Sequence, residues 1–313
     1  MKVYIASPHS NWMVDAMKPL LVERERENNS INTENMEIYL AGGATGNNIK
    51  IWKDNAETNP TKPMEVFLAG TNAEKNRANA EGDFAQKISI LESFYYMQDW
   101  MIPYIKNHWD FLLDSGAFTF MNDKKNANGV VWDEYLERYA QFINDNDVKL
   151  FFELDIDAVV GIKEVERLRA KLEKLTNKQS IPVWHRSRGK DYWFRMIQEY
   201  GYVALGGMVS GGVAYKDKVE KMFPWFLQTA KENDCKVHGL GYTSIKGMQK
   251  YKFHSVDSTA WLYGNRGGFL YYFNGIELVK EDKPKGTRLK AREVAVHNFR
   301  EWVKFQQYAK TNL

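Results

Sequence analysis

Carboxylates stand at the ends of several apolar runs in this sequence, where they could act together. Asp114 ends "FLLD", Asp155 and Asp157 end "FFELDID", and Asp257 ends "SVD". Short continuous apolar runs are typical of strands that are covered on both faces. If these strands are parallel, their carboxyl ends meet at one edge of the sheet. The sequence therefore predicts that the acids gather there, beside the Gly-rich turn that follows residue 205.

Clustered carboxylates suit a small number of chemistries. In displacement at a sugar carbon, one acid attacks or stabilises an oxocarbenium-like carbon and another carries a proton. If the glycosidic link is retained, the reaction proceeds through a covalent intermediate and two displacements. A second use is a divalent metal held by oxygen ligands, and the candidate ligands for a metal-assisted hydrolase are Asp155, Asp157 and His185.

A third use is structural, because the same acids could form salt bridges with neighbouring arginines. The candidate arginines are Arg186, Arg188 and Arg266.

The elements that must position these residues alternate between strand and helix. The predicted strands are 2–7, 36–42, 64–70, 110–116, 148–157, 181–187, 202–210, 236–243 and 253–259. Amphipathic helices are predicted over 131–146, 161–175, 215–233 and 287–310, with a kink or break at Pro224. This alternation favours a parallel (β/α)8 TIM-type barrel that forms a single domain over residues 1–313. A doubly wound open sheet is the alternative, but no Gly-rich dinucleotide fingerprint follows the first strand.

Composition limits the remaining possibilities. The chain has 313 residues and a net charge of +3, so a site for a polyanion must be a local patch. The densest basic segment is 280–292, which leads into the C-terminal helix expected to close the barrel. Its one cysteine, Cys235, excludes an internal disulfide and a multi-cysteine zinc site. No signal peptide is evident, and no apolar run approaches the roughly 20 residues of a membrane span, so we expect a soluble cytoplasmic protein.

Four stretches, in this order, resemble the tRNA-guanine transglycosylase superfamily. They are "DSGAF" (114–118), "ALGGMVSG" (204–211), "HGLGYTS" (238–244) and "SVDSTAWLYGNRGG" (255–268), and the match covers about 110–270. "FFELDID" and "PVWHRSRG" resemble the viral and bacterial branch that inserts 7-deazaguanine bases into DNA. The zinc site of the tRNA enzymes, three cysteines and a histidine, is absent. We therefore expect no zinc-binding subdomain and a polymer other than tRNA; a viral protein would act in the host cytoplasm.

The resemblance implies roles for individual residues. Asp257 matches the nucleophile that attacks C1′ of the target guanosine and holds the sugar covalently. Asp114 matches a base-binding acid that also handles protons. Ser115 would bind the base edge and Phe118 would stack on the ring. Arg266 matches a basic position on the nucleic-acid side.

Further positions would bind the base or the strand. Asp155 aligns best with a second base-reading acid, and Asp157 is equally suited by residue type. His185 would contact the base or the sugar–phosphate, or else be structural. Two glycines match a turn whose backbone approaches the base, and two arginines would either bind phosphate or pair with nearby acids. These residues are Gly206, Gly207, Arg186 and Arg188.

The resemblance thus implies an enzyme that replaces guanine in DNA with a free 7-deazaguanine base. No metal or cofactor is required, because one N-glycosidic bond replaces another. A base in duplex DNA would have to be flipped into the site. The alternatives are the same exchange on tRNA, a metal-assisted barrel hydrolase, and a non-catalytic nucleic-acid-binding barrel. The 7-substituent and the oligomeric state stay open, and a homodimer is one alternative.

Overall fold

The computed structural model describes one of the two compact units into which the chain divides. The units are Met1–Met17 with Lys87–Leu313, and Lys18–Gln86. The described residues are 1–6, 88–107, 109–116, 119, 129–207, 219–242, 244–262, 269–282 and 290–313, and all of them belong to the first unit. The prediction of a single domain is therefore not confirmed. The predicted strands 36–42 and 64–70 lie outside the described residues.

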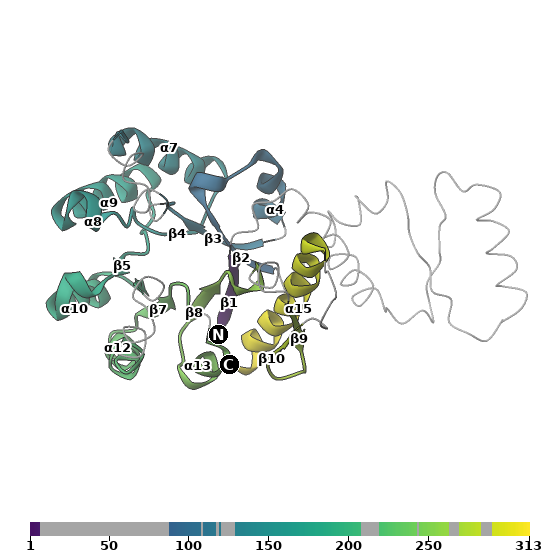
Figure 1. Ribbon diagram of the computed structural model, residues 1–313. Helices are drawn as coiled ribbons and strands as arrows, with labels where there is room; N and C mark the ends of the chain where they lie inside the picture. Colours follow the sequence, from purple (N-terminus) through teal and green to yellow (C-terminus); the bar gives the residue numbers. More distant parts are fainter. Residues whose placement is uncertain are drawn as a thin grey trace, which may run out of the picture. The chain divides into compact units, whose positions relative to one another are not determined.

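Eight parallel strands form one curled sheet (Figure 1), as expected for strands that alternate with helices. The strands are β1 (Lys2–Ala6), β2 (Ile88–Ser93), β3 (Trp109–Asp114), β4 (Leu150–Phe151), β5 (Val183–Trp184), β6 (Tyr202–Leu205), β7 (Lys236–Gly239) and β8 (Ser255–Ser258). Their order is β4-β3-β2-β1-β8-β7-β6-β5. One parallel bridge, between Phe152 and Ile181, links the segments at the two edges. This mixed α/β architecture is compatible with a TIM-like barrel.

Large and small apolar side chains from successive strands fill the interior of the sheet. The buried cluster includes Tyr4 from β1, Leu91 from β2, Leu112 from β3 and Ala204 from β6. Alternate strand residues point to the same face. Asp114 therefore shares the inner face with Leu112, and Asp257 shares a face with Ser255, at the carboxyl ends of their strands.

Helices cover the outer side of the curled sheet (Figure 1). The α-helices are α4 (Ile102–Asn107), α7 (Trp132–Asp145), α8 (Asp157–Val160), α9 (Ile162–Thr176), α10 (Gly189–Glu199), α12 (Phe223–Glu232), α13 (Ile245–Lys250) and α15 (Ala291–Asn312). Short 3-10 helices are η2 (Phe94–Tyr96), η3 (Asp99–Met101), η4 (Arg186–Arg188) and η5 (Ala260–Leu262). The helices predicted near residues 131, 161 and 287 are confirmed by α7, α9 and α15.

The break expected at Pro224 occurs one residue before it. Residues 219–220 are helical, residues 221–222 form a turn, and α12 begins at Phe223 with Pro224 in its first turn. A proline is tolerated there because the first N–H groups of a helix have no intrahelical acceptor.

The C-terminal helix α15 is tied to the sheet by one buried side chain. The Gln306 amide donates to the carbonyls of Val3 and Ser89, and its oxygen accepts from the Ser89 N–H at 2.9 Å. Strands β1 and β2 pair only at Ile5–Ile90 and Ala6–Leu91. Gln306 therefore supplies hydrogen bonds where the two strands do not bond each other.

An antiparallel hairpin, β9 (Phe269–Phe273) with β10 (Leu278–Asp282), precedes α15. Residues 283–289 of the basic segment lie outside the described part of the chain. Among the described residues, no helix combines the length and apolar character that crossing a membrane requires.

Candidate active site

Three of the predicted acids lie at the carboxyl ends of the strands and interact electrostatically. Asp114 is the last residue of β3, Asp257 lies in β8, and Asp155 follows β4. The pKa of Asp114 is raised from its ordinary value of 3.8 to about 6, first by burial and then by the charges of Asp257 and Asp155. The Gly116 N–H donates to Asp114 Oδ2 at 3.2 Å and opposes this rise in pKa. Asp114 can therefore exist in both protonation states near neutral pH.

Asp257 is held through one of its two oxygens. Its Oδ1 accepts from the Gly241 N–H at 2.6 Å and lies 3.2 Å from His238 Nε2. Within the described residues, no hydrogen bond reaches Oδ2. The side chain is 10% exposed, so the carboxylate is largely enclosed and is oriented by these two contacts.

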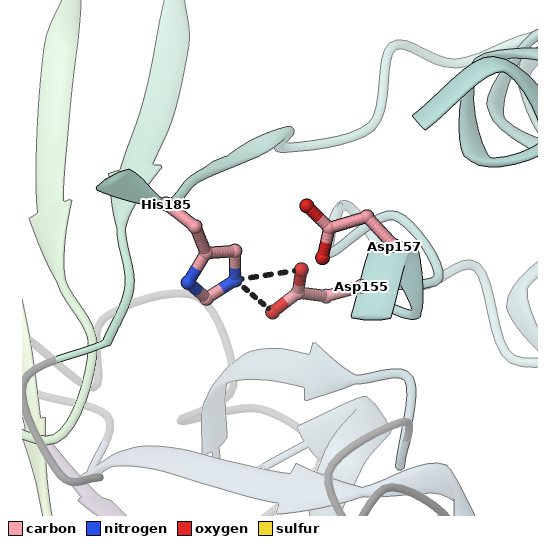
Figure 2. A group of neighbouring side chains, drawn as sticks. All are labelled: Asp155, Asp157 and His185. Carbon is pink, nitrogen blue, oxygen red and sulfur yellow. Dashed lines mark hydrogen bonds and ion pairs between the residues drawn. The ribbon is translucent and has the colours of Figure 1, made fainter. Parts of the chain in front are cut away.

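A second group of side chains surrounds Asp155. His185 Nε2 lies 2.7 Å from both oxygens of Asp155, and Asp157 lies beside them (Figure 2). One ligand atom from each of these three residues lies within 4.8 Å of the other two. The geometry alone would therefore permit a metal ion.

Two buried arginines change how this group is interpreted. The guanidinium of Arg188, 1% exposed, lies 3.4 Å from Asp155 and 3.2 Å from Asp157. It also contacts buried Glu153 at 2.7 Å, and Glu153 in turn pairs with Arg169 at 3.0 Å. A divalent cation would sit beside the fixed positive charge of Arg188, which repels it. The arrangement thus favours an ion-pair network over a metal centre.

His185 is the titratable member of this network. Burial would lower the pKa of His185, but hydrogen bonding to Asp155 and its charge outweigh burial, and the pKa is raised. A protonated His185 adds a positive charge to a group of three carboxylates and two arginines. The network is therefore closest to neutral when His185 is charged.

Gly206 gives the His185 ring its space. A Cβ at position 206 would lie 2.4 Å from His185 Cε1 and 2.9 Å from Val183 Cγ1, which is closer than real contacts allow. The expected approach of Gly206 to a base stays a prediction. Gly207 follows with a φ of +81°, a conformation that favours glycine.

The turn after Asp114 is tightly packed. Ser115 is fully buried, and its carbonyl accepts from the Tyr135 hydroxyl at 2.7 Å. Gly116 has a φ of +81°, and a Cβ there would lie 2.8 Å from Tyr95 Cβ. A contact between Ser115 and a base, which stays a prediction, would require this buried side chain to become accessible.

The predicted basic residues differ in their surroundings. The sequence left two roles open for Arg188, and the structure shows it pairing with the acids. Arg186, in the same 3-10 helix, is exposed. Phe118 and Arg266 lie outside the described residues.

Two residues near the acids were not assigned roles from the sequence. His238 contacts Asp257 from β7; its one indication was a polar residue inside the apolar run "KVHGL". Glu92 is buried in β2, and its pKa is raised to about 8 by burial, which outweighs the lowering by the Ser93 N–H, and by the charge of Asp114. Glu92 was missed because the run 88–93 was not recognised as a strand.

Comparison with known proteins gives no relative: no protein-family model, no curated protein and no solved structure matches the chain.

Proposed function

We propose that this protein is a base-exchange transglycosylase that replaces guanine in DNA with a 7-deazaguanine derivative. One observation carries the proposal. Asp114, whose pKa is raised to about 6, interacts with Asp155 and with Asp257, the carboxylate held by Gly241 and His238. We further propose that the eight-stranded sheet is a complete (β/α)8 barrel with this site at the carboxyl ends of its strands.

The first displacement would use Asp257 as the nucleophile. Oδ2 of Asp257 forms a bond to C1′ of the target nucleotide as the C1′–N9 bond breaks. Guanine leaves with the electron pair of that bond and takes a proton from Asp114. A carboxyl group with a pKa near 6 suits this transfer, because its two protonation states are both accessible.

The second displacement reverses these roles. A free 7-deazaguanine gives its N9 proton to the Asp114 carboxylate, and N9 attacks C1′. The C1′–Oδ2 bond then breaks and Asp257 leaves as a carboxylate. Asp155 would accept hydrogen bonds from the N–H groups of the purine. The charge of Asp155 raises the pKa of Asp114, and this interaction favours Asp155 over Asp157 as the base-reading acid.

DNA is proposed as the polymer because the sequence motifs resemble the DNA branch and the single cysteine, Cys235, cannot form the zinc site of the tRNA enzymes. A target guanine in duplex DNA would be flipped out of the stack to reach Asp257.

A metal-assisted hydrolase is the second candidate, favoured by the spacing of Asp155, Asp157 and His185. Buried Arg188 opposes it. Metal analysis of the purified protein, together with activity after chelation, separates the two. Stoichiometric metal and loss of activity on chelation would favour the hydrolase.

The proposal is tested by incubating the protein with labelled 7-deazaguanine and either DNA or tRNA. We expect label in DNA with the native protein and none with Asp257→Asn, which keeps the volume but removes the nucleophile. The matched control is Asp147→Asn, a change at an exposed residue with a φ of +49° that asparagine tolerates. Label found in tRNA alone would rule out DNA as the polymer substrate. Incorporation of label by Asp257→Asn would rule out Asp257 as the nucleophile.

A further inference from the structure

A line of polar side chains runs through the interior of the sheet behind Asp257. The Tyr202 hydroxyl contacts Ser255 Oγ, which lies 2.6 Å from His238 Nδ1. His238 Nε2 lies 3.2 Å from Asp257 Oδ1. The register explains the line, because His238 of β7 is paired with Ser255 of β8, and Asp257 is two residues further on the same face.

Hydrogen-bonding rules fix the direction of this line for a neutral His238. An ionised Asp257 only accepts, so the proton of a neutral His238 must be on Nε2. His238 Nδ1 then accepts from the Ser255 hydroxyl, and Ser255 Oγ accepts from the Tyr202 hydroxyl. Each group uses its one proton once. The reverse direction would require a protonated Asp257, which could not act as a nucleophile.

The surroundings of His238 hold its ring in place. His238 and Ser255 are fully buried, and the rings of Tyr4 and Phe152 pack against His238 with centroids 6.1 and 5.3 Å away. The titratable groups near it are Tyr4 on β1, Tyr202 on β6, and His254 and Asp257 before and in β8. Burial, followed by the charges of nearby lysines, lowers the pKa of His254 to about 4, so this neighbour is neutral at pH 7.

We propose that His238 is a positioning residue for Asp257, and that Ser255 and Tyr202 set its tautomer. The inference rests on the function proposed above. With Oδ1 held by His238 and Gly241, Oδ2 is the oxygen that bonds to C1′. These donors bind a carboxylate more strongly than the neutral ester of the glycosyl–enzyme. They therefore favour the step in which Asp257 leaves, so that less of the covalent intermediate is present at steady state than without them.

The test compares His238→Phe, which keeps a ring but no donor, with His238→Gln, whose amide can still donate to Asp257. Base exchange and the steady-state fraction of covalent protein–DNA adduct are both measured. For His238→Phe we expect exchange to fall about 10- to 100-fold, the effect of losing a hydrogen bond to a charged group, while the adduct fraction rises. His238→Gln should recover much of the exchange and a lower adduct fraction.

Ser255→Ala and Tyr202→Phe each remove one hydroxyl and extend the test even if His238→Phe fails to fold. Both should raise the adduct fraction, Ser255→Ala more strongly because Ser255 contacts His238 directly. If the native protein forms an adduct on Asp257 and the adduct fraction is unchanged in these variants, the positioning role of His238 is overturned but the proposed function is not. Equal impairment of His238→Phe and His238→Gln would reduce His238 to a packing role. No adduct in the native protein would overturn the proposed function as well.

Discussion

At the scale of single residues, the carboxyl group of Asp114 is harder to ionise in the folded protein than in the unfolded chain. Its pKa rises from 3.8 to about 6, first because it is buried and then because Asp257 and Asp155 carry the same charge. The folded state therefore binds this proton more tightly than the unfolded state between these two pH values. The contribution of Asp114 to stability falls as the pH rises through that window.

Asp114→Asn should therefore stabilise the protein at high pH. Asparagine keeps an oxygen that can accept from the Gly116 N–H but does not ionise. One pKa unit corresponds to about 1.4 kcal/mol, so we expect no gain below pH 4 and a gain of up to about 3 kcal/mol at pH 8. Denaturant unfolding from pH 4 to 8 measures this difference. The exposed control Asp147→Asn should show no such gain, and a pH-independent effect of Asp114→Asn would contradict the account.

The His185 imidazole depends on Asp155 for its raised pKa. Burial alone favours the neutral ring, so Asp155→Asn should lower the pKa of His185 below its ordinary value of 6.5. Asp157→Asn is the matched control and should lower it less, because the charge of Asp157 has the smaller influence. Titration of the histidine ring signals by NMR checks both variants. An unchanged pKa in Asp155→Asn would show that the contact in Figure 2 is not what holds the proton.

At the scale of elements, one side chain of α15 completes the bonding of β1 and β2. Gln306→Leu would leave the Ser89 N–H and two carbonyls without their partner. An unsatisfied buried polar group costs about 1–3 kcal/mol, so we expect the free energy of unfolding to fall by at least about 2 kcal/mol. Thermal or denaturant unfolding measures it. Gln307→Leu, at the next position of the same helix, is the control, and an equal loss in both variants would contradict a specific role for Gln306.

Much of the strand–helix order was predictable from sequence, because parallel strands covered on both faces are continuous apolar runs. Strand β2 was missed because Ser89 and Glu92 interrupt its apolar run, and the residue that bonds the Ser89 backbone, Gln306, comes from the distant helix α15. The hairpin β9–β10 was also missed. Strands β4 and β5 are only two residues long, so the polar residues predicted at their ends follow the strands: Asp155 and His185 lie in loops, whereas Asp157 begins α8 and Arg186 and Arg188 form η4.

The part of the candidate site that lies at strand ends was predictable from the sequence. Asp114, Asp155 and Asp257 lie where parallel strands would bring them together. The partners of these acids depend on register and side-chain direction, which residue types do not reveal. For that reason neither the contact between His238 and Asp257 nor the burial of Arg188 among three carboxylates could be derived from the sequence.

At the scale of the whole molecule, a net charge of +3 means that a nucleic acid must be bound by local basic residues. Arg186 is exposed close to the Asp155 network, whereas Arg188 forms ion pairs within that network. Arg186→Ala should therefore weaken DNA binding and reduce by about one the slope of log affinity against log salt. Binding titrations at several salt concentrations check this. Arg167→Ala, at an exposed arginine of α9, is the control; equal losses in both variants would contradict a local role for Arg186.

In the proposed reaction, Asp257 forms a covalent bond with a DNA sugar during base exchange. To test this, the protein is incubated with guanine-containing DNA and the reaction is quenched. The adduct is then digested and the attached sugar is located by mass spectrometry. We expect an adduct on Asp257 that is absent in Asp257→Asn and disappears when free 7-deazaguanine is supplied. A sugar attached to another residue, or exchange without any adduct, would contradict it.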